Sequence, residues 1–249
     1  MLDTSNTKKV IDMLRRYSDN REIIVDNINK LDKYTTYLGV CTQTPENIYV
    51  YINYSYSENI QEACFVHEIL HIILDHEGYP NIAINNLKMR NIKPEFHNTL
   101  HYLRDNFASV ITHPIVFSRE INLFDFNIDE YFEIQVEKKV ERFNKRKPKK
   151  RSLINEIFLN QQDILVGLDY FSYPTQYKDK IIKIFKEQYP GPHKSCLSLY
   201  KKLEFTTPNE CYISANKIKK HLIKYAKRKG ANKINIFWDA LDIVKSVTT

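Results

Sequence analysis

The segment His67-Glu68-Ile69-Leu70-His71 places two imidazoles and one carboxylate within five residues. In a helix, residues four apart point the same way, so His67 and His71 can hold one Zn²⁺. Glu68 then lies beside the cation, where its carboxylate can take a proton from a bound water. These residues predict a hydrolytic zinc centre with Glu68 as its general base.

The residues around this motif predict a buried helix. Asn59 followed by Glu62 is typical of a helix start with a capping box, and Gly78 followed by Pro80 is typical of a helix end. Apolar residues occupy nearly every side between these limits. Burial makes two histidines and a glutamate costly unless they are paired or bind a metal. A core helix whose histidines are satisfied by neighbouring carboxylates or carbonyls is the alternative.

Short elements are expected ahead of this helix. Residues 8–17 and 23–31 are predicted to be helices, and the β-branched and aromatic segments 34–40 and 48–54 to form a hairpin around turn residues 44–47. The second strand leads into the metal helix, where a free edge could pair with an extended peptide substrate. An interior strand without a free edge is the alternative.

A catalytic zinc requires a third protein ligand and an open position. A second helix is predicted over residues 95–112 and is expected to end before Pro114. His101 and Asp105 lie one turn apart along one flank of this helix, and His113 could reach the metal from its end. We expect His101 to be the third ligand, with Asp105 and then His113 as alternatives.

The strand, the His-Glu-x-x-His helix and the helix that follows resemble a zincin metallopeptidase. More narrowly, residues 45–115 are similar to the ImmA/IrrE-type family, whose second helix typically reads Glu-x-Glu-Ala-x-x-Phe-Ala-x-x-Leu-Leu-x-Pro. Phe107-Ala108 and Pro114 fall at the family's spacings. In this register His101 occupies the position of the zinc-binding glutamate, and a three-histidine site is chemically sound.

The family pattern is not complete. Leu103-Arg104 stands where the family has Glu-Ala, and Ile69-Leu70 where it has Leu-Gly. Other zincins use an aspartate four residues after a ligand to brace a metal histidine, a role that the resemblance implies for Asp105. The resemblance as a whole implies a zinc-dependent peptidase that cleaves a specific, regulatory intracellular protein.

The net charge of +7 is unevenly distributed along the chain. Residues 1–142 carry 15 Lys/Arg and 21 Asp/Glu, whereas residues 143–249 carry 22 and 9. The cation-rich segment 144–151, around Pro148, is predicted to be a linker. We therefore expect an α+β protein: a zincin-like domain over residues 1–143, with a small sheet, and a basic, mainly helical domain over residues 152–249.

The basic half leaves a second function open. Residues 144–151 and the helix predicted within 214–229 could contact the phosphates of nucleic acid, although no complete nucleic-acid motif is present. In that case the zincin core would be non-catalytic or degenerate, and the chain would act as a regulatory binding module. DNA affinity that falls steeply with salt, without proteolysis, is the expected sign of this alternative.

The sequence predicts a cytoplasmic protein that does not enter a membrane. The four cysteines, at positions 41, 64, 196 and 211, are widely spaced and form no Cys-x-x-Cys pair, as expected for reduced thiols. The first residues lack the apolar core of a signal peptide, and no apolar run approaches the roughly eighteen residues of a membrane span.

Overall fold

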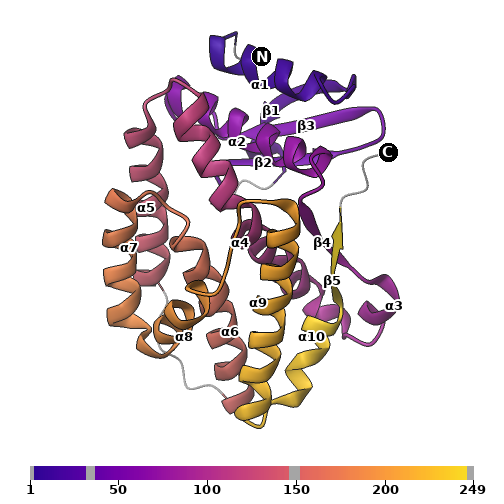
Figure 1. Cartoon of the computed structure of the whole chain (residues 1–249), viewed down its shortest axis with the longest axis vertical. Helices are drawn as coiled ribbons and strands as arrows, with labels where there is room; N and C mark the ends of the chain where they lie inside the picture. The colour runs from indigo at the N-terminus through magenta and orange to yellow at the C-terminus, as the bar shows by residue number, and fades with distance from the viewer. Residues whose placement is uncertain (1–2, 32–36, 146–151, 246–249) are drawn as a thin grey trace. The chain divides into compact units, whose positions relative to one another are not determined.

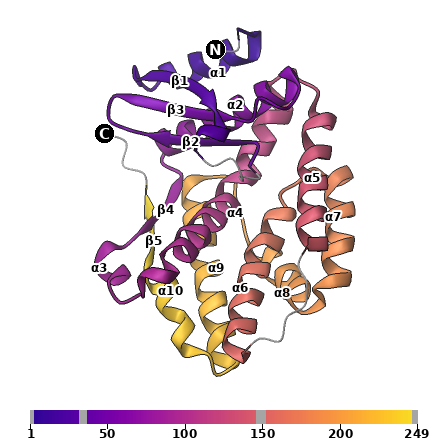
Figure 2. The ribbon, with the colours of Figure 1, turned by 180° about the vertical axis from the view of Figure 1, so that it is seen from behind.

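The computed structural model describes residues 3–31, 37–145 and 152–245 and shows a mixed α+β protein with two small sheets (Figure 1, Figure 2). The elements in chain order are α1 (Ser5–Arg15), β1 (Glu22–Asn27), η1 (Ile28–Lys30), β2 (Gly39–Gln43), β3 (Asn47–Ile52), α2 (Glu58–His76), β4 (Pro80–Ile84), α3 (Asn86–Met89), η2 (Pro94–Phe96), α4 (His97–Leu123), α5 (Ile128–Lys145), α6 (Leu153–Tyr170), α7 (Thr175–Gln188), α8 (Pro190–Tyr200), α9 (Pro208–Arg228), η3 (Asn232–Ile234), α10 (Asn235–Asp239) and β5 (Leu241–Lys245). None of the described helices combines the length and apolarity that a membrane span requires.

The chain divides into two compact units, each built from separate stretches of sequence. The first comprises residues 1–76 and 116–138, and the second residues 77–115 and 139–249. Helices α4 and α5 each continue from one unit into the other. This division differs from the sequential domains predicted from the charge distribution, and residues 146–151 of the predicted linker lie outside the described residues.

In the first unit, α2 packs on a three-stranded sheet with the order β1-β3-β2. β2 and β3 form the predicted hairpin, with Cys41 opposite Val50, although residues 34–36 of its first predicted strand lie outside the described part of the chain. β3 pairs with β1 on one side and β2 on the other, so of the two possibilities for this strand it is the interior strand without a free edge. In the described sheet, the edge strand beside α2 is β2.

Residues 23–27, the first part of the helix predicted over residues 23–31, lie in strand β1 instead. Ile23, Ile24 and Val25 favour extended backbone because their branched side chains pack well on a pleated surface. Parallel pairing with β3 satisfies their backbone groups. The helical prediction was therefore wrong because the long-range partner strand outweighed a local pattern.

Helix α2 closely matches the predicted helix, but its start is stabilised differently. Ser57 Oγ accepts a hydrogen bond from the backbone N–H of Ile60 at 3.4 Å. Asn59, the predicted cap, lies inside the helix, and its amide instead donates to Glu130 Oε2 at 2.9 Å. The helix ends as predicted, because Gly78 adopts φ +80°, a left-handed conformation that side-chain-bearing residues rarely take.

Helix α4 extends beyond its predicted end. Pro114 lies within the helix, which continues to Leu123. An internal proline removes one backbone hydrogen bond and costs about 3 kcal/mol. The residues that follow it, Val116, Phe117 and Glu120, are buried, and this packing maintains the helix. The continuation matters because His113 then lies within a helix, one turn before Phe117.

The second unit is mainly helical, with α6 packed against α7, α8 and α9. β4 pairs antiparallel with β5 near the end of the described chain. Trp238 on α10 is fully buried. The helix predicted within residues 214–229 is confirmed as part of α9, and the predicted mainly helical character of residues 152–249 is confirmed as well.

Candidate metal centre

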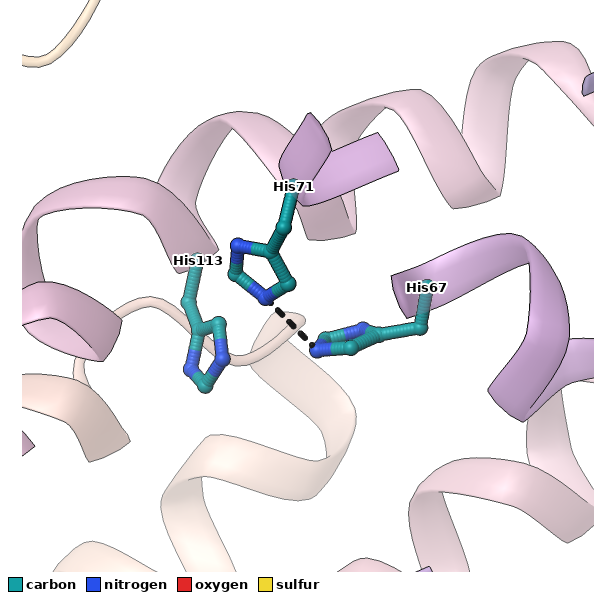
Figure 3. Close-up of side chains that lie close together, drawn as sticks. All are labelled: His67, His71 and His113. Carbon is teal, nitrogen blue, oxygen red and sulfur yellow. Dashed lines mark hydrogen bonds between the residues drawn. The ribbon is translucent and has the colours of Figure 1, made fainter. Parts of the chain in front are cut away.

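His67 and His71 present their ring nitrogens to each other from successive turns of α2. Their Nε2 atoms lie 3.1 Å apart, as the dashed line in Figure 3 shows. Two nitrogens bound at about 2.05 Å to a tetrahedral zinc are separated by about 3.3 Å. The pair therefore already has the spacing that one metal ion requires.

Glu120 orients the first of these rings. His67 Nδ1 donates to Glu120 Oε1 at 2.9 Å, and the Glu120 side chain is fully buried. A carboxylate on Nδ1 fixes the tautomer that presents Nε2 to a metal and increases the basicity of the ring. The rings of Phe117 and Tyr131 flank His67, with centroids at 5.8 and 6.4 Å. The imidazole is held from several sides.

His113 completes a group of three histidines. It lies on α4 one turn before Phe117. One ligand atom from each of His67, His71 and His113 lies within 4.8 Å of the other two, and Figure 3 shows the three rings gathered together. Of the described residues, these three form a group that could hold a metal ion.

A second carboxylate orients His113. Its Nδ1 donates to Asp169 Oδ1 on α6 at 2.6 Å, and Lys139 Nζ donates to Asp169 Oδ2 at 3.2 Å. Burial acts to raise the pKa of Asp169, but the charges and hydrogen bonds of His113 and Lys139 outweigh it and hold that pKa well below its usual range. Asp169 is therefore ionised, which favours His113 Nε2 as the nitrogen offered to a metal.

Glu68 lies against the edge strand β2. A Cβ atom placed on Gly39 would come within 3.3 Å of Glu68 Oε1, so glycine leaves room for the carboxylate there. Burial raises the pKa of Glu68, while the charge of His67 and a hydrogen bond from the Cys41 backbone oppose this shift. A carboxylate with a raised pKa is a stronger base, as proton transfer from water requires.

The structure does not add His101 or Asp105 to this group. Both are exposed on α4, and Asp105 forms an ion pair with Arg104 at 2.6 Å. The preference for His101 rested on the register of the family resemblance, in which it takes the position of the zinc-binding glutamate. Because α4 continues, His113 lies on the part of the helix next to Phe117, whereas His101 lies twelve residues earlier, about 18 Å along the axis. His113, the third choice from the sequence, is the candidate that lies with His67 and His71.

Other histidines near the motif have different partners. His76, at the end of α2, bonds to Asp19 Oδ2 at 2.9 Å and stacks on Tyr17. His97 Nε2 donates to the backbone oxygen of Ile92 at 3.0 Å. These contacts account for both rings without a metal.

Sequence reasoning missed Glu120 and Asp169. Glu120 lies seven residues after His113, a spacing that puts two residues on one face of a helix, but the expected end at Pro114 concealed it. Asp169 lies 56 residues from His113, and nothing local in the sequence marks it. No family model, curated protein or solved structure matches the chain.

Proposed function

We propose that this chain is a zinc-dependent peptidase in which His67, His71 and His113 hold the metal and Glu68 is the general base. The observation that carries the proposal is the meeting of three imidazole ligand atoms within 4.8 Å of one another. Two of these rings are also held by buried carboxylates, Glu120 and Asp169. That combination supports a metal centre more strongly than a satisfied core helix does.

The chemistry divides between the metal and the chain. His67, His71 and His113 would hold a zinc ion, which would supply Lewis acidity toward a water and a carbonyl oxygen. Glu68 accepts the proton of the attacking water and returns it to the leaving amine. Glu120 and Asp169 keep their histidine rings in the tautomer and orientation that ligation requires.

A peptide is the proposed substrate because of the neighbouring sheet edge. Of the described strands, β2 forms the edge of the sheet beside α2, and its residue Gly39 adjoins Glu68. An extended peptide can add to such an edge through main-chain hydrogen bonds, which would bring a peptide bond near this carboxylate. The resemblance to ImmA/IrrE-type peptidases supports the same substrate class and further suggests a specific regulatory protein as the target.

The proposal is tested by peptide cleavage with Glu68→Gln. The substrate is a mixed fluorogenic peptide library, and the control is Glu58→Gln, which changes an exposed glutamate in the first turn of the same helix. Glu68→Gln should retain zinc and lose about 10²- to 10⁴-fold in cleavage rate, whereas Glu58→Gln should cleave like wild type. Full cleavage by zinc-loaded Glu68→Gln would refute the role of this residue.

A further inference from the structure

Helix α9 in the second unit has one side buried in the core. Its buried residues, none more than 1% exposed, are Cys211, Ser214, Ala215, Ile218, Leu222 and Ala226. They recur at helical spacing, so they fix which side of the helix is turned inward. The opposite side is uncovered, and α9 can be followed along its length in Figure 1.

The uncovered side is a continuous basic stripe, here called the α9 basic face. Its members, all exposed, are Lys217, Lys220, Lys224, Lys227 and Arg228. At 100° per residue these positions fall within an arc of about 100°, and they extend about 16 Å along the axis. Lys219 does not belong to it, because it is partly buried and lies about 200° around the helix from Lys217, outside this arc.

No acidic residue balances this face. The chain has no Asp or Glu between Cys211 and Trp238. Within the described residues, none of the five side chains forms an ion pair. Like charges three and four residues apart repel and destabilise a helix, and an ordinary solvated face relieves this by mixing signs. A partner that supplies negative charge would remove the repulsion.

The basic surface continues at the exposed Lys202, just after the end of α8. Lys217 Nζ donates to the backbone oxygen of Lys202 at 2.9 Å, and Ser195 Oγ on α8 bonds to His221 Nε2 at 2.7 Å. Burial first, and then the charges of Arg228, Lys202 and Lys224, lower the pKa of His221. These cations therefore act together at one place on the surface of the second unit.

The chemistry of the face selects among polyanions. Lysines act as point charges and suit phosphate oxygens, whereas reading base edges favours planar, bidentate groups. Single-stranded nucleic acid needs exposed aromatic rings on which its bases stack. The described residues of α9 offer none, since Tyr212 and Tyr225 are partly buried. A duplex backbone fits this surface better than a single strand does.

We propose that the α9 basic face binds the phosphate backbone of double-stranded DNA without sequence preference. The surface lies within the second unit and uses none of the metal-centre histidines. The binding is independent of zinc, and its strength is set by the number of phosphates that the five cations neutralise. Each neutralised phosphate releases counterions, so the affinity falls as salt rises.

The test compares two triple variants that remove the same charge. One variant combines Lys217→Gln, Lys220→Gln and Lys224→Gln. The control combines Lys180→Gln, Lys183→Gln and Lys186→Gln on α7, where exposed Asp179 and Glu187 balance the exposed lysines. Binding of a labelled DNA duplex of mixed sequence is measured by fluorescence anisotropy over a salt series, with full-length protein whose folding is checked by circular dichroism.

The α9 triple should weaken DNA binding at least about tenfold at physiological salt and reduce the slope of log K against log salt by about 2.7. The α7 triple should keep most of the affinity and the slope of wild type. Equal losses in the two triples would show that net charge alone matters and would overturn the proposal. Absence of DNA binding by wild type, or stronger binding to polyglutamate than to DNA, would overturn it as well.

Discussion

Nδ1 of His67 donates a hydrogen bond to Oε1 of the fully buried Glu120, and this bond aims the opposite nitrogen of the ring at His71. Glu120→Gln should therefore weaken zinc binding by about 10- to 100-fold, because an amide braces the imidazole less strongly than a carboxylate does. Competition with a chromogenic chelator measures the change.

The control for this prediction is Glu137→Gln, which removes the same charge from an exposed position on α5. Its zinc affinity should equal that of wild type. If Glu120→Gln binds zinc as tightly as Glu137→Gln, the bond from Glu120 has no part in metal binding.

Asp169 should be the second carboxylate that sets zinc affinity. It accepts from His113 Nδ1 at 2.6 Å and also contacts Lys139. Asp169→Asn should lower zinc affinity by about 10- to 100-fold, because His113 is no longer held by a charged acceptor. The matched control is Asp163→Asn, since Asp163 is also a buried aspartate on α6. Both variants could lose stability, but equal zinc affinity in the two would contradict the role of Asp169.

The sequence was sufficient to predict the residues of the metal centre that lie on the single helix α2. His67, Glu68 and His71 are fixed by the period of a single helix, and the apolar residues around them predicted that helix. The choice of His101 as third ligand came instead from the register of the family resemblance, and the end expected at Pro114 left His113 at the tip of its helix. Local rules favoured an end there, and the buried residues beyond the proline outweighed them.

Contacts between segments far apart in the chain could not be predicted from the sequence for a different reason. β4 pairs with β5 across more than 150 residues, and His113 meets Asp169 across 56. Neither segment carries a local signal for its partner, because pairing and ion-pair geometry are decided by the folded chain. β1 was predicted as a helix for the same reason, since only its pairing with β3 distinguishes it from a short helix.

Gly167 on α6 should tolerate no side chain. A Cβ atom there would lie 2.4 Å from Phe185 Cε1 and 2.8 Å from Cys196 Sγ, closer than packed atoms approach. Gly167→Ala should therefore lower the free energy of unfolding by about 1 to 3 kcal/mol, as measured by urea denaturation. In Gly191→Ala the added methyl group meets nothing within 4 Å, so no loss is expected. Equal losses would contradict this packing.

Asp19 should make stability depend on pH in a defined direction. Its carboxylate accepts from Arg21 Nη2 at 2.6 Å and bonds to His76 at 2.9 Å. The hydrogen bonds from Arg21 hold the pKa of Asp19 well below its ordinary value of 3.8. The stabilisation is therefore complete above pH 3.8 and is lost as the pH falls toward the folded-state pKa.

Asp19→Asn should lower the free energy of unfolding by about 2 kcal/mol at neutral pH, because hydrogen bonds to a charged group are lost. The difference from wild type should narrow below pH 3.8, where the wild-type carboxyl also takes up its proton. Urea denaturation of wild type and Asp19→Asn at neutral pH and below pH 3.8 measures the loss and its narrowing. Asp26→Asn, which removes an exposed ion pair with Lys30, should change little. A deficit in Asp19→Asn that stays constant with pH would rule out the ionic contribution.

The most direct test of the metal centre is the zinc content of tag-free protein for wild type, His113→Ala and His101→Ala, measured by atomic emission after dialysis. The two variants remove a histidine from the same helix, one within the three-histidine group and one exposed. Wild type and His101→Ala should hold about one zinc ion per chain, and His113→Ala should lose it, since a three-ligand site is reduced to two. Zinc retained by His113→Ala and lost by His101→Ala, or a wild-type protein that binds no zinc, would contradict the account.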